Sequence, residues 1–215
     1  MIPELDPVEA RVLGALVEKE ITTPEYYPLT LNALVNACNQ KSNRDPVVSY
    51  EQDDVESALD RLRHKQLSTI LTGGGNRVPK YGHRFQERLN LGRREVALIC
   101  ELLLRGPQTL GELRDRASRM HRFSDIEEVE SVLNSLCERE PPFVRKLPKQ
   151  AGMKESRYAH LLSGEVQVAE YSEPIQQRVS GGGERIADLE AQVEDLKDRV
   201  RLLEEQFSRF RAQFE

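Results

Sequence analysis

Hydrophobic residues recur at intervals of three and four along six stretches of the chain, and this is the spacing of one face of an α-helix. The first stretch follows Asp6-Pro7-Val8-Glu9, where a capping Asp, a Pro suited to the first helical position and a Glu three residues after the cap predict a helix start. A capping Thr30 and capping boxes beginning at Ser49, Thr109 and Ser124 predict further starts. The predicted helices cover about 7–20, 30–38, 49–66, 93–104, 109–117 and 125–140.

Segments with β-branched or alternating residues follow the third and the sixth predicted helix. The first two segments are 67–72 and 80–85, with the glycine-rich stretch GGGNRVP between them, and the second two are 143–148 and 157–162. Each pair predicts a β-hairpin. Three helices followed by a hairpin is the order of a winged-helix domain, in which the hairpin is the wing.

One module occurs twice, because three sequence blocks recur in the same order along the chain. The recurring blocks are DDVESALDRL at 53–62 and EEVESVLNSL at 127–136, TLNAL at 30–34 and TLGEL at 109–113, and Tyr81-Gly82-His83 and Tyr158-Ala159-His160. The predicted fold class is therefore mainly α with small β-hairpin wings (α+β). We predict two tandem winged-helix domains, at 1–91 and 92–164, followed by a C-terminal coiled-coil helix.

The C-terminal part of the chain has a different pattern from the two modules. Residues 165–184 show no sustained period and end in a glycine run, which predicts a flexible linker. From 185 to 215 the apolar residues follow each other at spacings of three and four, which predicts a coiled coil and, through it, a homodimer. The a and d residues favour parallel strands, and antiparallel pairing or a helix folded back on its own modules are the open alternatives. The predicted dimerisation seam consists of Ile186, Leu189, Val193, Leu196, Val200, Leu203, Phe207 and Phe210.

The formal net charge is −5, and it is unevenly distributed along the chain. Residues 1–91 carry 11 Lys and Arg against 13 Asp and Glu, residues 92–164 carry 13 against 11, and residues 165–215 carry 7 against 12. The two modules are therefore near neutral. Binding to nucleic acid would need local basic patches, because the overall field does not attract phosphate.

Residue types that carry catalysis, metal binding or membrane insertion do not form a recognisable pattern. Cys38, Cys100 and Cys137 lie in helical apolar patterns, so we predict buried free thiols. The N-terminus lacks the charged and apolar regions of a signal peptide, and no run approaches eighteen apolar residues. The histidines are scattered, without metal-ligand spacing. We expect a soluble, cytoplasmic, non-enzymatic protein with no catalytic residue, no metal, no cofactor and no membrane contact.

The first module, in particular TTPEYYPLTLNALVNACNQKSNRDPVVSY followed by DDVESALDRLR, resembles the YceH-like family of uncharacterised bacterial proteins. The resemblance covers about 5–162 and the C-terminal tail, and its most specific piece is Asn39 to Pro46. It implies tandem winged-helix domains in a bacterial cytoplasmic protein. It implies no established activity.

A winged helix commonly presents its third helix to the major groove of DNA and its wing to phosphates. The outward residues of the two predicted third helices are acidic or neutral, which makes both helices poor groove readers: Asp53, Ser57, Asp60, His64, Glu127, Ser131, Asn134 and Glu138. Basic groups lie instead in the loop after Cys38, around the wings and ahead of the predicted helix at 125–140, where they are Arg114, Arg116, Arg119 and Arg122. The candidate nucleic-acid contacts are Lys41, Asn43, Arg44, Arg77, Lys80, Arg84, Lys149 and Lys154.

Two functions therefore remain in competition. The first is a DNA-associated regulatory or architectural protein that contacts mainly the phosphate backbone. The alternative is a protein–protein interaction adaptor that uses its winged-helix surfaces and a dimerising coiled coil. The wing and loop arginines favour DNA, whereas the near-neutral modules and acidic third helices favour another protein as the partner.

Overall fold

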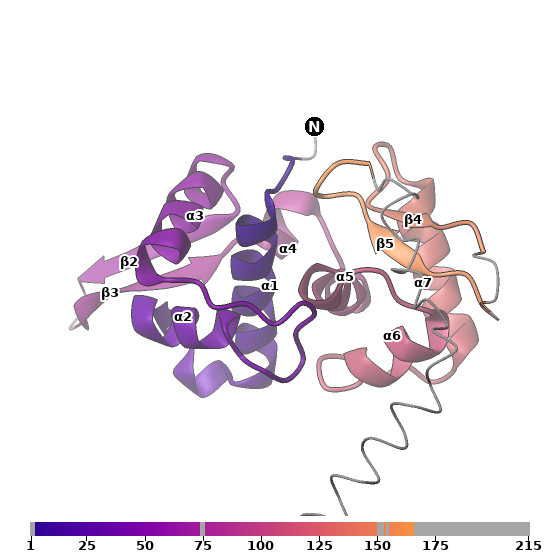
Figure 1. Ribbon diagram of the computed structural model, residues 1–215, viewed down its shortest axis with the longest axis horizontal. Helices are drawn as coiled ribbons and strands as arrows, with labels where there is room; N and C mark the ends of the chain where they lie inside the picture. The colour runs from indigo at the N-terminus through magenta and orange to yellow at the C-terminus, as the bar shows by residue number, and fades with distance from the viewer. Residues whose placement is uncertain (1–2, 74–75, 150–152, 154, 166–215) are drawn as a thin grey trace, which may run out of the picture. The chain divides into compact units, whose positions relative to one another are not determined.

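Two similar sets of helices and strands follow each other along the chain (Figure 1). The computed structural model describes residues 3–73, 76–149, 153 and 155–165, without the side chains of residues 73, 76 and 77. The first set consists of α1 (Pro7–Thr22), the 3-10 turn η1 (Pro24–Tyr26), β1 (Leu29–Thr30), α2 (Leu31–Cys38), α3 (Gln52–His64), β2 (Ser68–Gly73), β3 (Asn76–His83) and α4 (Phe85–Leu89). The second set consists of α5 (Arg93–Arg105), α6 (Leu110–Ala117), α7 (Ile126–Glu138), β4 (Val144–Lys146) and β5 (Tyr158–His160). This mixture of helices and small antiparallel sheets confirms the predicted α+β class.

Side chains that precede the helices satisfy their free amides, as the sequence predicts for three of the starts. At α1 the Glu9 N–H donates to Asp6 Oδ1 over 2.8 Å, and the Asp6 N–H donates to Glu9 Oε2 over 2.7 Å. Thr30 caps α2 and Thr109 caps α6, each through its hydroxyl oxygen. These reciprocal bonds explain why the chain turns into a helix at these residues.

The third helix of each set begins later than predicted. The cap of α3 is Glu51 and not Ser49, because the side chain of Asn39 holds both the N–H and the carbonyl of Tyr50, each over 2.8 Å, and keeps this segment extended. The cap of α7 is Asp125 and not Ser124. Both serine capping boxes were therefore wrong by one or two residues in position, although the two helices exist.

The two sets share a strand arrangement that goes beyond the predicted hairpins. In the first set β1 pairs antiparallel with β3, so that the sheet order is β1-β3-β2, with Leu29 opposite Tyr81. In the second set β4 pairs with β5, and Gln108 forms an antiparallel bridge with Tyr158. Tyr81 and Tyr158 are equivalent in the sequence repeat, and each faces the residues just before the second helix of its set.

Helix α1 of the first set packs against helix α5 of the second (Figure 1). Their apolar faces form one continuous core. Gly14 marks the close approach, since a Cβ added there would lie 2.9 Å from Leu104 Cδ2. The Cys100 thiol donates to the Gly14 carbonyl over 3.3 Å. The two sets consequently belong to one compact unit. The predicted linker, coiled coil and dimerisation seam lie outside the described residues.

Candidate nucleic-acid interface

Arg44, a predicted nucleic-acid contact, is buried in the structure, with 5% of its surface exposed. Its guanidinium forms a two-pronged ion pair with the fully buried carboxylate of Glu18 in α1, with Nη1 3.0 Å from Oε1. It also donates to the Ala37 carbonyl from Nε over 3.1 Å and from Nη2 over 2.9 Å. The Arg44 guanidinium is therefore paired entirely with groups inside the protein. We therefore withdraw Arg44 from the candidate surface contacts.

The loop after Cys38 fastens the two modules together. Arg11 of α1 donates to the Pro46 carbonyl over 2.7 Å, which holds the loop to the first module. On the other side, the Asp45 N–H donates to the Leu104 carbonyl over 3.0 Å, and the Arg105 guanidinium donates to the Asn43 side chain. Asn43 has a φ of 58°, in the left-handed region that Asn tolerates better than most residues. Asn43 is thus a structural residue of the junction.

Three further charges complete a buried ionic network at this junction. Arg119, which follows α6, pairs with Glu18 of the first module and with Glu101 of the second, its Nη2 lying 2.7 Å from Glu101 Oε1. Arg105 lies 3.3 Å from the same Glu101 carboxylate. Both glutamate side chains are fully buried. Charges taken out of water must be paired, and here the Arg119–Glu18 pair crosses from one module to the other.

The network separates the pKa values of its two carboxyls. Burial alone raises the pKa of Glu18, but the hydrogen bond and charge of Arg44, with the charge of Arg119, more than offset it and hold the pKa below its ordinary value. For Glu101 burial prevails over Arg119 and Arg105, and its pKa is raised. Glu18 is therefore the securely ionised centre of the network.

The remaining predicted contacts do not converge on one surface. Lys41 is exposed in the junction loop, and Lys149 is exposed after β4. Lys80 is half-buried in β3, and Arg84 pairs with Glu87 over 2.7 Å on the surface. Arg77 lies in β3, but its side chain is outside the described part of the structure. Lys154 lies outside the described residues altogether. Among the described candidates, Lys41, Lys80 and Arg84 thus belong to different elements of the first module, and Lys149 belongs to the second.

The third helices differ in the charge of their exposed faces. On α3 the exposed side chains include Asp53, Asp54, Glu56 and Asp60, as the sequence pattern indicates. On α7 the exposed residues between Glu127 and Glu138 are Ser131, Asn134 and Ser135, which carry no charge, and the half-exposed Glu130 lies 3.6 Å from Lys146. An acidic face repels phosphate, whereas an uncharged polar face can enter a groove and form hydrogen bonds there.

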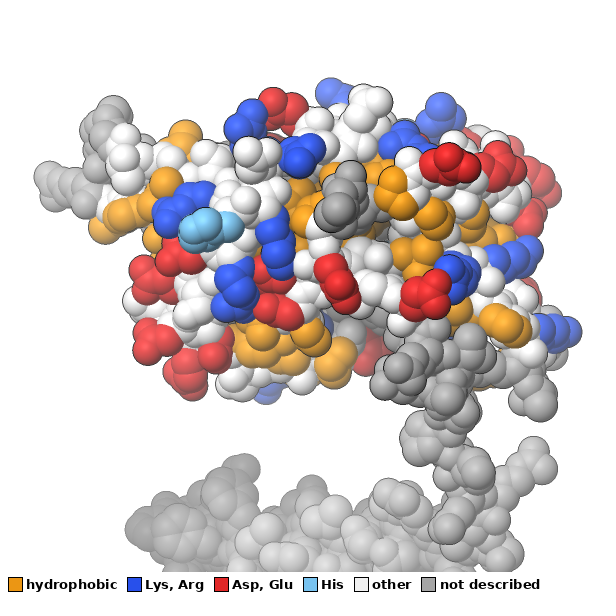
Figure 2. Space-filling model, turned by 90° about the horizontal axis from the view of Figure 1, so that it is seen from above, with side chains coloured by type: hydrophobic (Ala, Val, Ile, Leu, Met, Phe, Trp, Pro, Cys, Tyr) orange, Lys and Arg blue, Asp and Glu red, His pale blue; other side chains and the backbone are white. Residues whose placement is uncertain are grey.

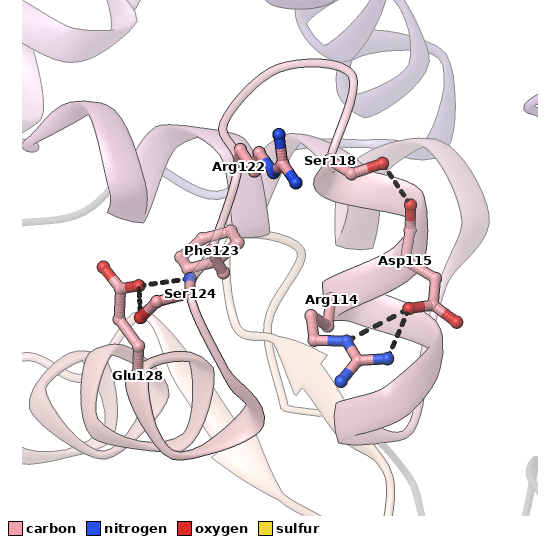
Figure 3. A pocket seen from close by; sticks show the side chains of 7 residues that line it. All are labelled: Arg114, Asp115, Ser118, Arg122, Phe123, Ser124 and Glu128. Carbon is pink, nitrogen blue, oxygen red and sulfur yellow. Dashed lines mark hydrogen bonds and ion pairs between the residues drawn. The ribbon is translucent and has the colours of Figure 1, made fainter.

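A pocket of about 630 Å³ opens beside the start of α7 (Figure 3). Figure 3 shows Arg122 extending from the loop between α6 and α7 toward Ser118, and Arg114 of α6 held beside Asp115. Arg114 donates to Asp115 Oδ1 from Nε over 3.1 Å and from Nη2 over 3.0 Å. Arg122 is exposed and forms no ion pair with any described residue. Phe123, Ser124 and Glu128 complete the lining.

The side chain of Glu128 stabilises one wall of this pocket. Its Oε2 accepts from the Ser124 N–H and from the Ser124 hydroxyl, each over 2.9 Å, and its Oε1 lies 3.1 Å from Arg94. The bonds from Ser124, followed by that from Arg94, lower the pKa of Glu128 to about 2. Glu128 is therefore ionised, with Arg94 as its counter-charge. The two arginines were visible in the sequence, but only the fold shows that they share a pocket with the start of α7.

The family model described as "Protein of unknown function, DUF480" matches residues 5–153. The chain belongs to this family. Its relatives include a UPF0502 protein of Pelobacter propionicus, 54% identical over 98% of each chain, and one of Solibacter usitatus, 54% identical over 99% of this chain and 98% of the relative. A UPF0502 protein of Geobacter sulfurreducens is 52% identical over 98% of each chain. These matches agree with the resemblance to the YceH-like family.

The DUF480 match spans both the junction network and the pocket beside α7. Within the part of the chain that the structure describes, no helix is long and apolar enough to cross a membrane. In the same part, no three His, Cys, Asp or Glu side chains converge as metal ligands would. Cys38 and Cys100 are buried free thiols, and burial raises the pKa of Cys38 to about 12, which leaves its sulfur protonated and unreactive.

Proposed function

We propose that this chain is a non-enzymatic tandem winged-helix protein that binds duplex DNA through its second module, mainly by contacts to the phosphate backbone. The order helix, strand, helix, helix, strand, strand supports the winged-helix assignment. In the first module it is α1, β1, α2, α3, β2 and β3. In the second it is α5, the bridge at Gln108, α6, α7, β4 and β5.

The observation that carries the proposal is the position of Arg114 and Arg122 beside a helix face whose central exposed residues are uncharged, with Glu127 and Glu138 at its two ends. In this geometry α7 lays Ser131, Asn134 and Ser135 in the groove, while the two arginines reach the phosphates along one side. Lys149, exposed after β4, lies in the wing that contacts the backbone on the other side. The exposed pair between Arg114 and Asp115 is worth only about 0–1 kcal/mol in water, so a phosphate can compete for Arg114.

The first module has a different role in this proposal. A carboxylate about 4 Å from a phosphate costs on the order of 1 kcal/mol in bulk water, and more where water is excluded. Helix α3 exposes four such carboxylates, and of these only Asp60 is paired with a described arginine, Arg63 at 2.9 Å. We infer that the first module positions the second through the buried junction. Two chains would be joined by the predicted C-terminal coiled coil, which would present two DNA-binding modules.

The test is a salt titration of binding to a fluorescein-labelled random duplex, followed by fluorescence anisotropy. We expect affinity to fall steeply between about 50 and 200 mM salt, and the double variant Arg114→Ala/Arg122→Ala to flatten the slope of log K against log salt by about 1.8, or 0.9 for each lost contact. Arg88→Ala, which removes an exposed arginine from α4 in the first module, is the matched control and should leave the slope unchanged. No binding at the lowest salt, or an unchanged slope in the double variant, would overturn the proposal.

A further inference from the structure

Strand β2 forms an open edge of the first module's sheet. The sheet order is β1-β3-β2, so β2 pairs with β3 on one side only, and none of the described residues supplies a strand to its other side. Its sequence, STILTG, contains no charge and no proline, the residues with which proteins commonly protect such edges. Ile70 and Leu71 are 36% and 42% exposed.

The ladder shows which backbone groups of β2 are available. The Arg84 N–H donates to the Leu67 carbonyl over 2.9 Å, which marks these two residues as a hydrogen-bonded pair. Antiparallel pairs alternate, so Thr69 and Leu71 direct their backbone groups to β3, and Ser68 and Ile70 direct theirs outward. A shift in register after Leu71 ends the regular edge. The open edge is therefore short, and the outward N–H and C=O groups of Ile70 lie at its centre.

The two faces that flank this edge differ in chemistry. On the side of α3, Ile70 is paired with Tyr81, and the pKa of Tyr81 is raised first by burial and then by the charges of Glu56 and Asp60. On the opposite face Leu71, 42% exposed, is paired with the half-buried Lys80. Figure 2 shows hydrophobic side chains toward its left-hand end and acidic side chains below them, with basic side chains and a histidine between. The side of α3 therefore carries exposed carboxylates, and the opposite side carries Leu71 beside Lys80.

We propose that the outer edge of β2 accepts an extended segment of a partner protein as an additional strand, in which basic side chains alternate with apolar ones. The basic side chains lie over Glu56 and Asp53 of α3, which are exposed and form no ion pair with described residues. The apolar side chains lie against Leu71 and the aliphatic stem of Lys80. Main-chain hydrogen bonds supply the affinity, and the alternating faces supply the choice of partner.

A second copy of this chain fits the edge poorly. Pairing β2 with its own copy brings two α3 helices to the same strand pair, and their exposed carboxylates repel each other. A basic partner removes that repulsion and gains ion pairs. The surface is separate from the pocket beside α7, so it does not depend on DNA binding.

The experiment uses the full chain and a fluorescein-labelled octapeptide of alternating lysine and valine, with the alternating glutamate and valine peptide as its counterpart. Ile70→Pro removes the outward N–H without touching the bonds to β3, which is the one way in which proline is tolerated in a strand. We expect it to weaken lysine–valine peptide binding at least about tenfold, the effect of losing one or two hydrogen bonds. Glu56→Lys, which leaves the strand intact, should weaken it by a similar factor.

Circular dichroism of each variant separates lost binding from lost folding, and Glu56→Lys tests the charge argument even if Ile70→Pro unfolds. The proposal is overturned if the glutamate–valine peptide binds as well as the lysine–valine peptide. It is equally overturned if a folded Ile70→Pro binds like the wild type, since α3 alone would then hold the peptide. A fall in molar mass on Ile70→Pro in light scattering would show that a second copy is the occupant and would refute the basic partner.

Discussion

Replacing Arg44 by alanine tests whether the loop after Cys38 is a structural junction. The change removes an ion pair to the fully buried Glu18 carboxylate and both bonds to the Ala37 carbonyl. Breaking a buried pair from one side costs about 3–5 kcal/mol, because the other charge stays buried. Arg119 still reaches Glu18, so we expect a loss of about 3 kcal/mol, at the lower end of this range.

The measurement is equilibrium unfolding in urea, with Arg63→Ala as the matched control. Arg63 also pairs with a carboxylate, Asp60 at 2.9 Å, but the two side chains are 49% and 57% exposed, so the control should lose no more than about 1 kcal/mol. If Arg44→Ala costs no more than Arg63→Ala, the loop is not a junction, and Arg44 returns to the set of candidate surface contacts.

The same pair gives a dependence on pH whose sign follows from the lowered pKa of Glu18. The unfolded chain binds this proton more tightly than the folded one, so the stability from Glu18 is present above its unfolded pKa of about 4.3 and is lost as pH falls through the lower folded pKa. Without Arg44, burial is offset only by Arg119 and Lys19, and the folded pKa of Glu18 rises toward or above the unfolded value. Because the acid-linked loss of stability scales with the gap between the two pKa values, Arg44→Ala should lose less stability than the wild type as pH falls below about 4.3 in urea unfolding at stepped pH.

Two further predictions concern the core and the tail. Gly14→Val should lower the free energy of unfolding by about 1–3 kcal/mol in thermal unfolding, because the added Cβ lies 2.9 Å from Leu104 Cδ2 and 3.3 Å from Leu103 Cβ. The control Gly111→Ala in α6, with nothing within 4 Å of its added Cβ, should raise it by about 0.5–1 kcal/mol. Equal effects of the two variants would contradict the close approach of α1 and α5. Truncation after Gly183 should convert a dimer to a monomer in light scattering, and an unchanged mass would reject the coiled coil as the dimerisation element.

The sequence repeat and local capping were sufficient to predict most helices and both hairpins. Asp6, Thr30 and Thr109 act through residues three positions away, so their bonds are visible in the sequence. The cap at Ser49 failed because Asn39, in a different segment, holds Tyr50 extended. Strand β1 is two residues long and depends on pairing with β3, and therefore has no pattern of its own.

The candidate site was harder to predict because charge alone does not show whether a side chain is exposed. Arg44 lies in a polar loop and looks like a surface residue, yet its partner Glu18 is 26 positions away. Arg119 pairs with that same carboxylate from 101 positions away. A glutamate within the apolar stretch of α1 is the signal that could have indicated a buried ion pair. Arg114 and Arg122 were recognised as basic, but their common pocket with α7 depends on the packing of α6 against α7.

The most direct test of the central proposal is amide NMR of the full chain titrated with a random DNA duplex at low salt. The account predicts chemical-shift changes at Arg114, at 118–124 and along the exposed face of α7, with no change along α3. Changes concentrated on α3 and the β2–β3 hairpin, or none in the second module, would contradict DNA binding through α7.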